Sequence, residues 1–262
     1  MRNGCLLLRL FNTIGLVLTL GVSISADAGL FGLLSGTSWK EEVLLHDGQK
    51  IIVIRSQTRG GNYEIGQPPP VKEHTISFVL PNSGNTITWT SEYGEDVGRA
   101  NFNLLALHVL NSTPYIVASP NLCLAYNKWG RPNPPYVFFK YDGHTWQRIP
   151  LSEFPVEFKT INVAASTLAD EDRLTKLGFV SAEKIKELNN EFTQPEYKTI
   201  LREAYPTAAG GCDEMVYDGK GGWIGIGWFR DQRSREACLL YCARYQITPQ
   251  FCPCDRFFKE GK

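Results

Sequence analysis

The reactive side chains that cluster most closely in this sequence are four cysteines near the C-terminus with the spacing C-x3-C-x9-C-x-C: Cys238, Cys242, Cys252 and Cys254. Four thiolates this close could hold zinc tetrahedrally, or they could oxidise to disulfides. Cys238 and Cys242 lie four residues apart in a predicted helix, and neighbours on one helix face rarely reach disulfide torsions. We therefore expect each of them to bond outside its helix, to Cys252, Cys254 or Cys212.

Six of the seven cysteines lie beyond residue 28, all but Cys5, and among these six Cys123 stands far from the others in the first half of the chain. It could bridge two regions by pairing with Cys212, or it could be a buried free thiol. Six cysteines allow fifteen pairings, and the sequence does not select one. A catalytic redox pair is disfavoured, because no Cys-x-x-Cys opens a helix and lowers the pKa of a thiol.

Residues 1–28 predict an export signal. Arg2 and Arg9 give a basic start, the apolar run Leu10 to Ile24 follows, and Ala-Asp-Ala at 26–28 forms a small-x-small cleavage pattern. We expect a mature chain from about Gly29, periplasmic or secreted. Cysteines are oxidised there, so disulfides are favoured over zinc, and no metal or other cofactor is expected. The alternative is an uncleaved leader that stays as an anchor.

Charge and hydropathy exclude two classes of partner for the mature chain. Loss of Arg2, Arg9 and Asp27 with the leader leaves 25 basic and 26 acidic residues, from 27 of each in the whole sequence. No basic stripe is present, which disfavours nucleic-acid binding through phosphates. No later apolar run approaches the roughly 20 residues of a spanning helix, so no transmembrane segment is expected after cleavage.

Candidate catalytic residues are few. Of the four histidines, His108 lies in an apolar strand (LLALHVL) and is the best candidate for a general base, although a histidine packed in the core fits the same pattern. Glu92, Glu95 and Asp96 cluster around Gly94 and could chelate calcium or form an acid/base pair, or they could be a solvated loop. No nucleophile elbow, zinc-protease helix or phosphate-binding loop is present.

A binding surface is better supported than a catalytic one. Trp129 and Arg131 adjoin a proline-rich loop (residues 131–135) beside Asn127, and aromatic, amide and guanidinium groups together suit sugar rings or peptides. Nearby rings, such as Phe138, Phe139 and Trp146, are instead expected to fill the core of the β region.

Strands and hairpins must position these residues. Asp-Gly pairs at 47–48, 142–143 and 218–219 separate apolar runs and predict hairpins, because both turn positions tolerate positive φ. Two further hairpins are expected at 75–90 and 104–118. Many short strands with such turns predict a mainly β fold, an antiparallel sandwich or meander.

The second half predicts helices and a small module. Helical spacing covers 167–177 and 181–190, and Thr193-Gln194-Pro195-Glu196 predicts a third helix to about Ala204. After Gly210, residues 221–227 form a glycine-rich stretch, a hairpin strand is expected from Trp223 to Phe229, and Asp231 or Ser234 can cap a helix to about Tyr245. The expected organisation is a signal peptide (1–28), a β-rich domain (29–158), a helical segment (159–206) and a disulfide-rich α+β module (207–262).

Two resemblances accompany this reading. Residues 39–155, with NKWGRPNPPYVFFKY, and the segment YDGKGGWIGIGWFRD resemble a group of exported bacterial proteins of unknown function. The C-terminal cysteine spacing is similar to that of WSC-type and PAN-type extracellular modules, which bind carbohydrate or protein. The resemblance implies a binding module but transfers no binding residue.

The combined expectation is an exported, non-catalytic protein that binds a carbohydrate or a protein of the envelope or the extracellular space. It would bind through the Trp129–Arg131 loop or the C-terminal module. Two alternatives remain: a secreted hydrolase that uses His108 or the acids at Glu92, Glu95 and Asp96, and a metal-binding envelope protein that uses the terminal cysteines.

Overall fold

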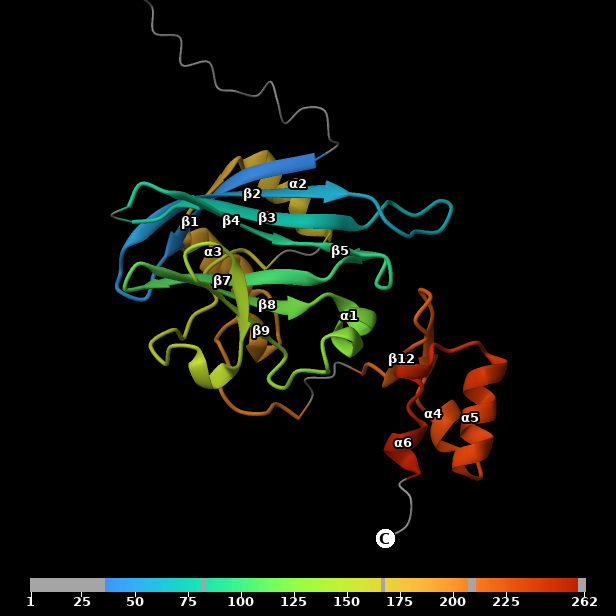
Figure 1. The fold of residues 1–262 in the computed structure, drawn as a ribbon. Coiled ribbons are helices and arrows are strands. Elements are labelled where there is room, and N and C mark those ends of the chain that lie inside the picture. The colour runs from blue at the N-terminus through green and yellow to red at the C-terminus, as the bar shows by residue number, and fades with distance from the viewer. Residues whose placement is uncertain (1–35, 82, 166–167, 207–210, 259–262) are drawn as a thin grey trace, which may run out of the picture. The chain divides into compact units, whose positions relative to one another are not determined.

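A computed structural model describes residues 36–81, 83–165, 168–206 and 211–258 of the chain (Figure 1). The expected leader lies in residues 1–35 and so falls outside the described residues. Among the described residues, no helix has both the length and the apolar character needed to cross a bilayer.

The first sheet has five strands in the order β11-β1-β2-β3-β4. Its antiparallel strands are β1 (Gly36–Leu44), β2 (Lys50–Arg59), β3 (Val71–Val79) and β4 (Thr86–Ser91). Burial alternates along each of them, because successive side chains point to opposite faces of a sheet. The expected turn joins β1 to β2: Gly48 has a φ of +86°, and Asp47 Oδ1 accepts a hydrogen bond from the Gln49 N–H at 3.0 Å.

The second sheet has the order β10-β9-β8-β7, and its neighbours are antiparallel. Its strands are β7 (Phe102–Leu110), β8 (Thr113–Pro120), β9 (Val137–Tyr141) and β10 (Trp146–Ile149). Asn111 and Ser112 join β7 to β8 with φ angles of 49° and 59°, the left-handed conformation of a tight hairpin turn. Before this sheet, β5 (Tyr93–Gly94) and β6 (Arg99–Ala100) pair as a short hairpin.

The two sheets lie one above the other and form a sandwich (Figure 1). One core cluster contains side chains from both inner faces, among them Val53, Ile76, Leu107 and Ile116. A second cluster lies on the other face of the second sheet, where Leu105 and Val117 pack against Phe154 and Phe158. Because strands β7 and β8 are buried on both faces, they are largely apolar instead of alternating. The mainly β, antiparallel fold predicted from the sequence is confirmed.

Helices α2 (Leu168–Leu177) and α3 (Ala182–Asn190) follow the sandwich strands, close to their predicted bounds. Ser181 caps α3 by accepting a hydrogen bond from the Lys184 N–H at 3.2 Å. Between the helices, β11 (Phe179–Val180) pairs in parallel with β1. The buried residues of this region form a cluster that includes Trp39: Ala164, Leu174, Val180, Ile185 and Leu188.

The predicted third helix, from residue 193 to 204, is wrong. Only one 3₁₀ turn forms there, η2 (Pro195–Tyr197). The chain then pairs with an earlier segment: Thr199 bridges Thr160, and the Ile200 N–H donates to Lys159 O at 2.9 Å. Burial of Ile200 in the second core cluster accompanies this pairing, so tertiary contacts override the local helix signal.

The C-terminal module is built from short elements around the cysteines. They are β12 (Met215–Tyr217), β13 (Trp223–Gly225), α4 (Gly227–Arg230), α5 (Arg235–Arg244), η3 (Pro249–Phe251) and α6 (Cys254–Phe257). Ser234 caps α5 as one of the two predicted candidates, because its hydroxyl accepts from the Ala237 N–H. The predicted glycine-rich strand to residue 229 is too long: the Asp231 N–H donates to Gly227 O, so the chain turns into α4 after Gly225.

Candidate functional site

A run of polar side chains interrupts the apolar inner face of the first sheet. Alternation along β2 places Arg55 and Gln57 on the same buried face as Val53. On β3, His74 lies on the face that carries Ile76. Gln57 is the direct cross-strand partner of His74, so the two side chains meet inside the sandwich.

Gln57 connects His74 to a buried carboxylate on α2. Glu171 is 2% exposed and forms an ion pair with Arg59. With its amide oriented to satisfy its neighbours, Gln57 donates to Glu171 Oε2 at 3.0 Å and accepts from His74 Nδ1 at 2.9 Å. Both Arg59 and Gln57 thus donate to the carboxylate, and the resulting chain runs from Arg59 through Glu171 and Gln57 to His74.

This chain of contacts determines which nitrogen of His74 carries the proton. Arginine can only donate, and Glu171 is held as an acceptor, so the Gln57 oxygen faces the imidazole. Nδ1 must then be the protonated nitrogen, which leaves Nε2 as an acceptor. Burial, and secondarily the charge of Arg55, lower the pKa of His74 to about 3, so the ring is neutral at physiological pH. Burial also raises the pKa of Glu171, against the opposing effect of the Arg59 charge.

A second polar cluster, formed by Trp39, Glu41 and Arg55, lies beside the first and is buried within the protein. Glu41 Oε1 accepts from Arg55 Nη1 at 3.2 Å and from Trp39 Nε1 at 2.6 Å, and Glu41 Oε2 accepts from the Ala164 N–H. The Arg55 guanidinium also lies 5.3 Å from the centroid of the Trp39 ring. This cluster holds the segment around residue 164 against the sheet, and the Nε of Arg55 is its one buried atom without a hydrogen-bond partner among the described residues.

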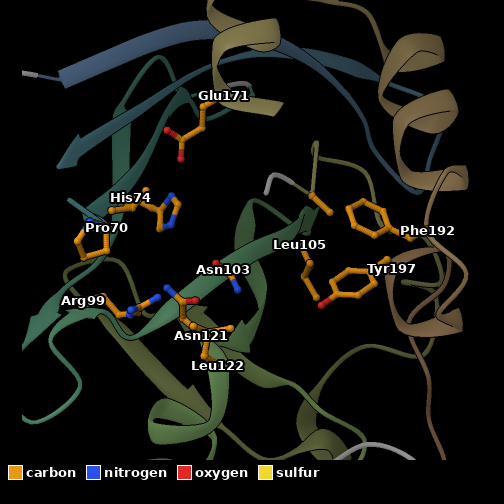
Figure 2. Close-up of a pocket in the computed structure, with 12 residues that line it drawn as sticks. Pro70, His74, Arg99, Asn103, Leu105, Asn121, Leu122, Glu171, Phe192 and Tyr197 are labelled. Atoms are coloured by element: carbon orange, nitrogen blue, oxygen red, sulfur yellow. The ribbon is translucent and has the colours of Figure 1, made fainter. Parts of the chain in front are cut away.

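The His74 cavity opens beside the first polar cluster, with a volume of about 310 Å³ (Figure 2). That volume lies at the lower end of the range for small-molecule sites. Polar and apolar side chains line it together: Pro70, Val71, His74, Arg99, Asn103, Leu105, Asn121, Leu122, Ala165, Glu171, Phe192 and Tyr197. They come from β3, β6, β7, the start of α1 (Leu122–Lys128), α2 and the segment after α3.

Three polar groups of the lining have no partner within the described part of the chain. These are the Nε2 atom of His74, the guanidinium of Arg99 and the side-chain amide of Asn103. A buried or half-buried polar group without a hydrogen bond is costly, and native proteins place few of them. Three such groups around one cavity mark it as a place where a ligand or water completes their hydrogen bonds.

The two ends of the cavity differ in character. Figure 2 shows His74 and Arg99 on one side of the view and the rings of Phe192 and Tyr197 on the other. Those rings contact each other, with centroids 4.7 Å apart and planes tilted by 34°. The His74 cavity therefore has a polar end and an aromatic end, which suits a ligand that is itself polar at one end.

The structure places the predicted binding loop in an internal contact. Asn127 donates from Nδ2 to Cys123 O and to Asp213 O, each at 2.9 Å, and its Oδ1 accepts from the Met215 N–H. Arg131 donates to the same Oδ1 and to the carbonyls of residues 212 and 213. Both side chains are partly buried, and their hydrogen bonds connect α1 and the loop after it to the C-terminal module.

Trp129 is also committed to contacts within the protein. Its ring centroid lies 4.5 Å from that of Phe102, and it packs against the core between the sheets. Its indole Nε1 donates to Asn101 Oδ1 at 3.3 Å. Of the other aromatic residues, Phe138 is buried, and Phe139 and Trp146 pack partly buried against the core, in the positions expected for them.

The predicted catalytic candidates are not brought together. His108 is fully buried, stacks on Phe158 at 4.6 Å between centroids, and contacts Thr160 O through Nε2 at 3.0 Å. Burial lowers its pKa to about 4. Glu92 and Glu95 are exposed, while Asp96 pairs with Lys128 at 2.8 Å. Among the described residues these acids do not converge on a metal-sized site.

The six described cysteines form three disulfides: Cys123–Cys212, Cys238–Cys254 and Cys242–Cys252. The first joins α1 to the C-terminal module, and the other two tie α5 to the tail. Of the terminal cysteines, Cys242, Cys252 and Cys254 have sulfur atoms within 4.8 Å of one another. If the disulfides were reduced, these three thiols would be close enough to bind one metal ion. A thiol titration on protein purified without reductant distinguishes the two states, because disulfides leave no titratable thiol among these six.

The residues of the His74 cavity were not singled out in the sequence, although one signal was present. In KIIVIRSQTR, Arg55 and Gln57 occupy positions in phase with buried Val53. A polar residue in the buried phase of a strand violates the local pattern, and such violations concentrate at functional sites. Comparison with protein-family models, curated proteins and solved structures found no match to this chain.

Proposed function

We propose that this protein is a binding protein that holds a small ligand in the His74 cavity. The observation that carries the proposal is the group of three unpartnered polar side chains, His74, Arg99 and Asn103, around one cavity of about 310 Å³. By contrast, the polar atoms of Asn127 and Arg131 are engaged within the chain. The proposal therefore moves the binding role from the predicted loop to this cavity.

Binding is preferred to catalysis for a chemical reason. Covalent catalysis of acyl transfer needs a nucleophile within reach of a base. No serine, threonine or cysteine is among the described residues that line the cavity, although His74 could accept a proton there. His108, the base expected from the sequence, stacks in the core and does not line the cavity.

The proposed place of action is the periplasm or the extracellular space. Three disulfides support it, because such bonds persist in oxidising compartments and are rare in the cytosol. The leader-like residues 1–28 support it from the sequence. Amino-terminal sequencing of the protein recovered from a periplasmic extract tests both features together, and recovery of an intact amino terminus from the cytosol would contradict it.

A fluorescent probe can test whether the cavity is a binding site. The amphipathic anion 1-anilinonaphthalene-8-sulfonate is titrated into the full chain, with saturation at one probe per protein as the expected result. The variant Ala165→Phe fills the cavity and should weaken binding at least tenfold, because Ala165 lines it. The matched control Ala243→Phe lies on an exposed position of α5 and should bind as the wild type does. Equal binding by both variants would refute the proposed site.

A further inference from the structure

The charges around the His74 cavity do not cancel. The charged side chains that line it, or pair with its lining, are Arg59, Arg99 and Glu171. Arg59 and Glu171 neutralise each other, and His74 is neutral, so the charge of Arg99 remains. An unpaired guanidinium at the edge of a partly buried cavity favours an anion, and a planar carboxylate matches its geometry.

The polar end also contains one acceptor that lacks a donor. His74 is 4% exposed, its Nδ1 proton is donated to Gln57, and its Nε2 has no partner among the described residues. Only a group that donates a hydrogen bond, such as a hydroxyl or an N–H, satisfies that atom. Arg99 favours an anionic group and His74 needs a hydrogen-bond donor, so the ligand must carry both groups at the same end.

The charges around the cavity indicate whether the ligand donor that binds His74 Nε2 is an ammonium or a hydroxyl. An ammonium group would need a free carboxylate, since burying a cation without a partner is strongly unfavourable. Glu171 is the carboxylate among the described lining residues, and Arg59 and Gln57 already occupy it. A hydroxyl meets the requirement of His74 without adding a charge. The opposite end, formed by Leu105, Phe192 and Tyr197, suits an apolar or aromatic group.

We infer that the His74 cavity takes a small hydroxycarboxylic acid with an apolar or aromatic side group. Its carboxylate binds Arg99 and Asn103, its hydroxyl donates to His74 Nε2, and its side group packs toward Phe192 and Tyr197. This inference rests on the proposed binding function and adds the chemical class of the ligand.

A series of four related compounds tests each part of the inference by calorimetry on the full chain. The probes are 3-phenyllactate, its neutral amide, 3-phenylpropanoate without the hydroxyl, and phenylalanine with an ammonium in place of the hydroxyl. We expect 3-phenyllactate to bind at least tenfold more tightly than each of the others, since each of them either loses the charge-assisted hydrogen bond to Arg99, leaves the buried His74 acceptor unsatisfied, or buries an unpaired ammonium.

Variants assign each preference to its residue. Arg99→Met should remove the preference for 3-phenyllactate over its amide, and His74→Leu should remove the preference over 3-phenylpropanoate. Arg233→Met, which deletes an exposed arginine elsewhere, should leave both preferences unchanged. Circular dichroism confirms that each variant is folded, and Arg99→Lys, which keeps the charge, should retain part of the preference for the acid.

The outcomes separate this inference from the proposed function. If the neutral amide or phenylalanine binds as well as 3-phenyllactate, the ligand class is wrong, while a loss of binding in Ala165→Phe would still support the cavity as a site. If none of the four compounds binds, the ligand class is also refuted. If, in addition, the anilinonaphthalene probe is insensitive to Ala165→Phe, the proposed function fails with it.

Discussion

Acidification should destabilise this protein through His74 and His108, two buried histidines of the sandwich. Their pKa values in the folded protein are about 3 and about 4, against 6.5 for an exposed histidine. The unfolded chain therefore takes up protons that the folded protein does not, and the stability present above pH 6.5 is lost as the pH falls through the window down to about 3–4. Between pH 7.5 and pH 5.0, the linkage relation gives a loss of about 2 kcal/mol from each histidine.

Glu171 acts in the opposite direction over the same window. Its pKa is raised by burial, so the folded protein binds a proton there at a higher pH than the unfolded chain does. Acidification toward pH 5.0 then stabilises the folded state at this residue. The loss in the wild-type protein is consequently smaller than the sum of the two histidine contributions, and differences between variants are the informative quantity.

Urea unfolding at pH 7.5 and pH 5.0 measures the effect. In His74→Asn an amide replaces the Nδ1 donor to Gln57, and in His108→Gln an amide replaces the nitrogen that contacts Thr160. Each variant should lose about 2 kcal/mol less on acidification than the wild type does. Asp142→Asn is the control: the pKa of Asp142 is lowered to about 2, mainly by hydrogen bonds from backbone N–H groups, so its contribution is lost only below about pH 3.8. A wild-type pH response in both histidine variants would refute the reasoning.

Other perturbations test the remaining internal contacts by the same unfolding assay at pH 7.5. Replacing Cys123 and Cys212 with serine opens a link between residues 89 apart and should cost about 2–5 kcal/mol, whereas an unchanged unfolding midpoint would contradict a disulfide there. Asn127→Asp removes the Nδ2 donor to the Cys123 and Asp213 carbonyls, although the Asp213 carbonyl keeps its bond from Arg131, and should cost about 0.5–1.5 kcal/mol for each hydrogen bond lost; a neutral result would argue against these contacts. Glu41→Ala leaves the 1% exposed Arg55 without its carboxylate and should lower the free energy of unfolding by about 3–5 kcal/mol. The double change Glu41→Met with Arg55→Leu should restore most of this stability. An equal loss in both variants would show that burial of an unpaired charge is not the cause.

Much of the sandwich could be predicted because its signals are local. Each hairpin is encoded by its own turn and by alternation in the flanking runs, as at Asp47-Gly48 and at Asp142, whose Oδ1 accepts hydrogen bonds from residues 144 and 145. The caps Ser181 and Ser234 are local in the same sense. Features of this kind depend on a few neighbouring residues, so a single sequence contains them.

The candidate site could not be predicted, because it depends on strand register. Gln57 and His74 are 17 positions apart and become partners only once β2 pairs with β3 in one register. Glu171 lies on α2, a helix that comes after all four strands of the second sheet in the sequence. The failed helix at 193–204 has the same origin, since the pairing of Thr199 with Thr160 is not visible in the local pattern.

Strand β11 has a consequence for how this protein behaves at high concentration. An uncovered edge strand exposes N–H and C=O groups to which a strand of another molecule can be added, and this is a common route to aggregation. β11 is two residues long, yet its partners Lys40 and Glu41 lie in the middle of the nine-residue strand β1. No second chain can then pair along β1 without first displacing β11. A short segment between two helices thus protects the β1 side of the first sheet against intermolecular strand addition.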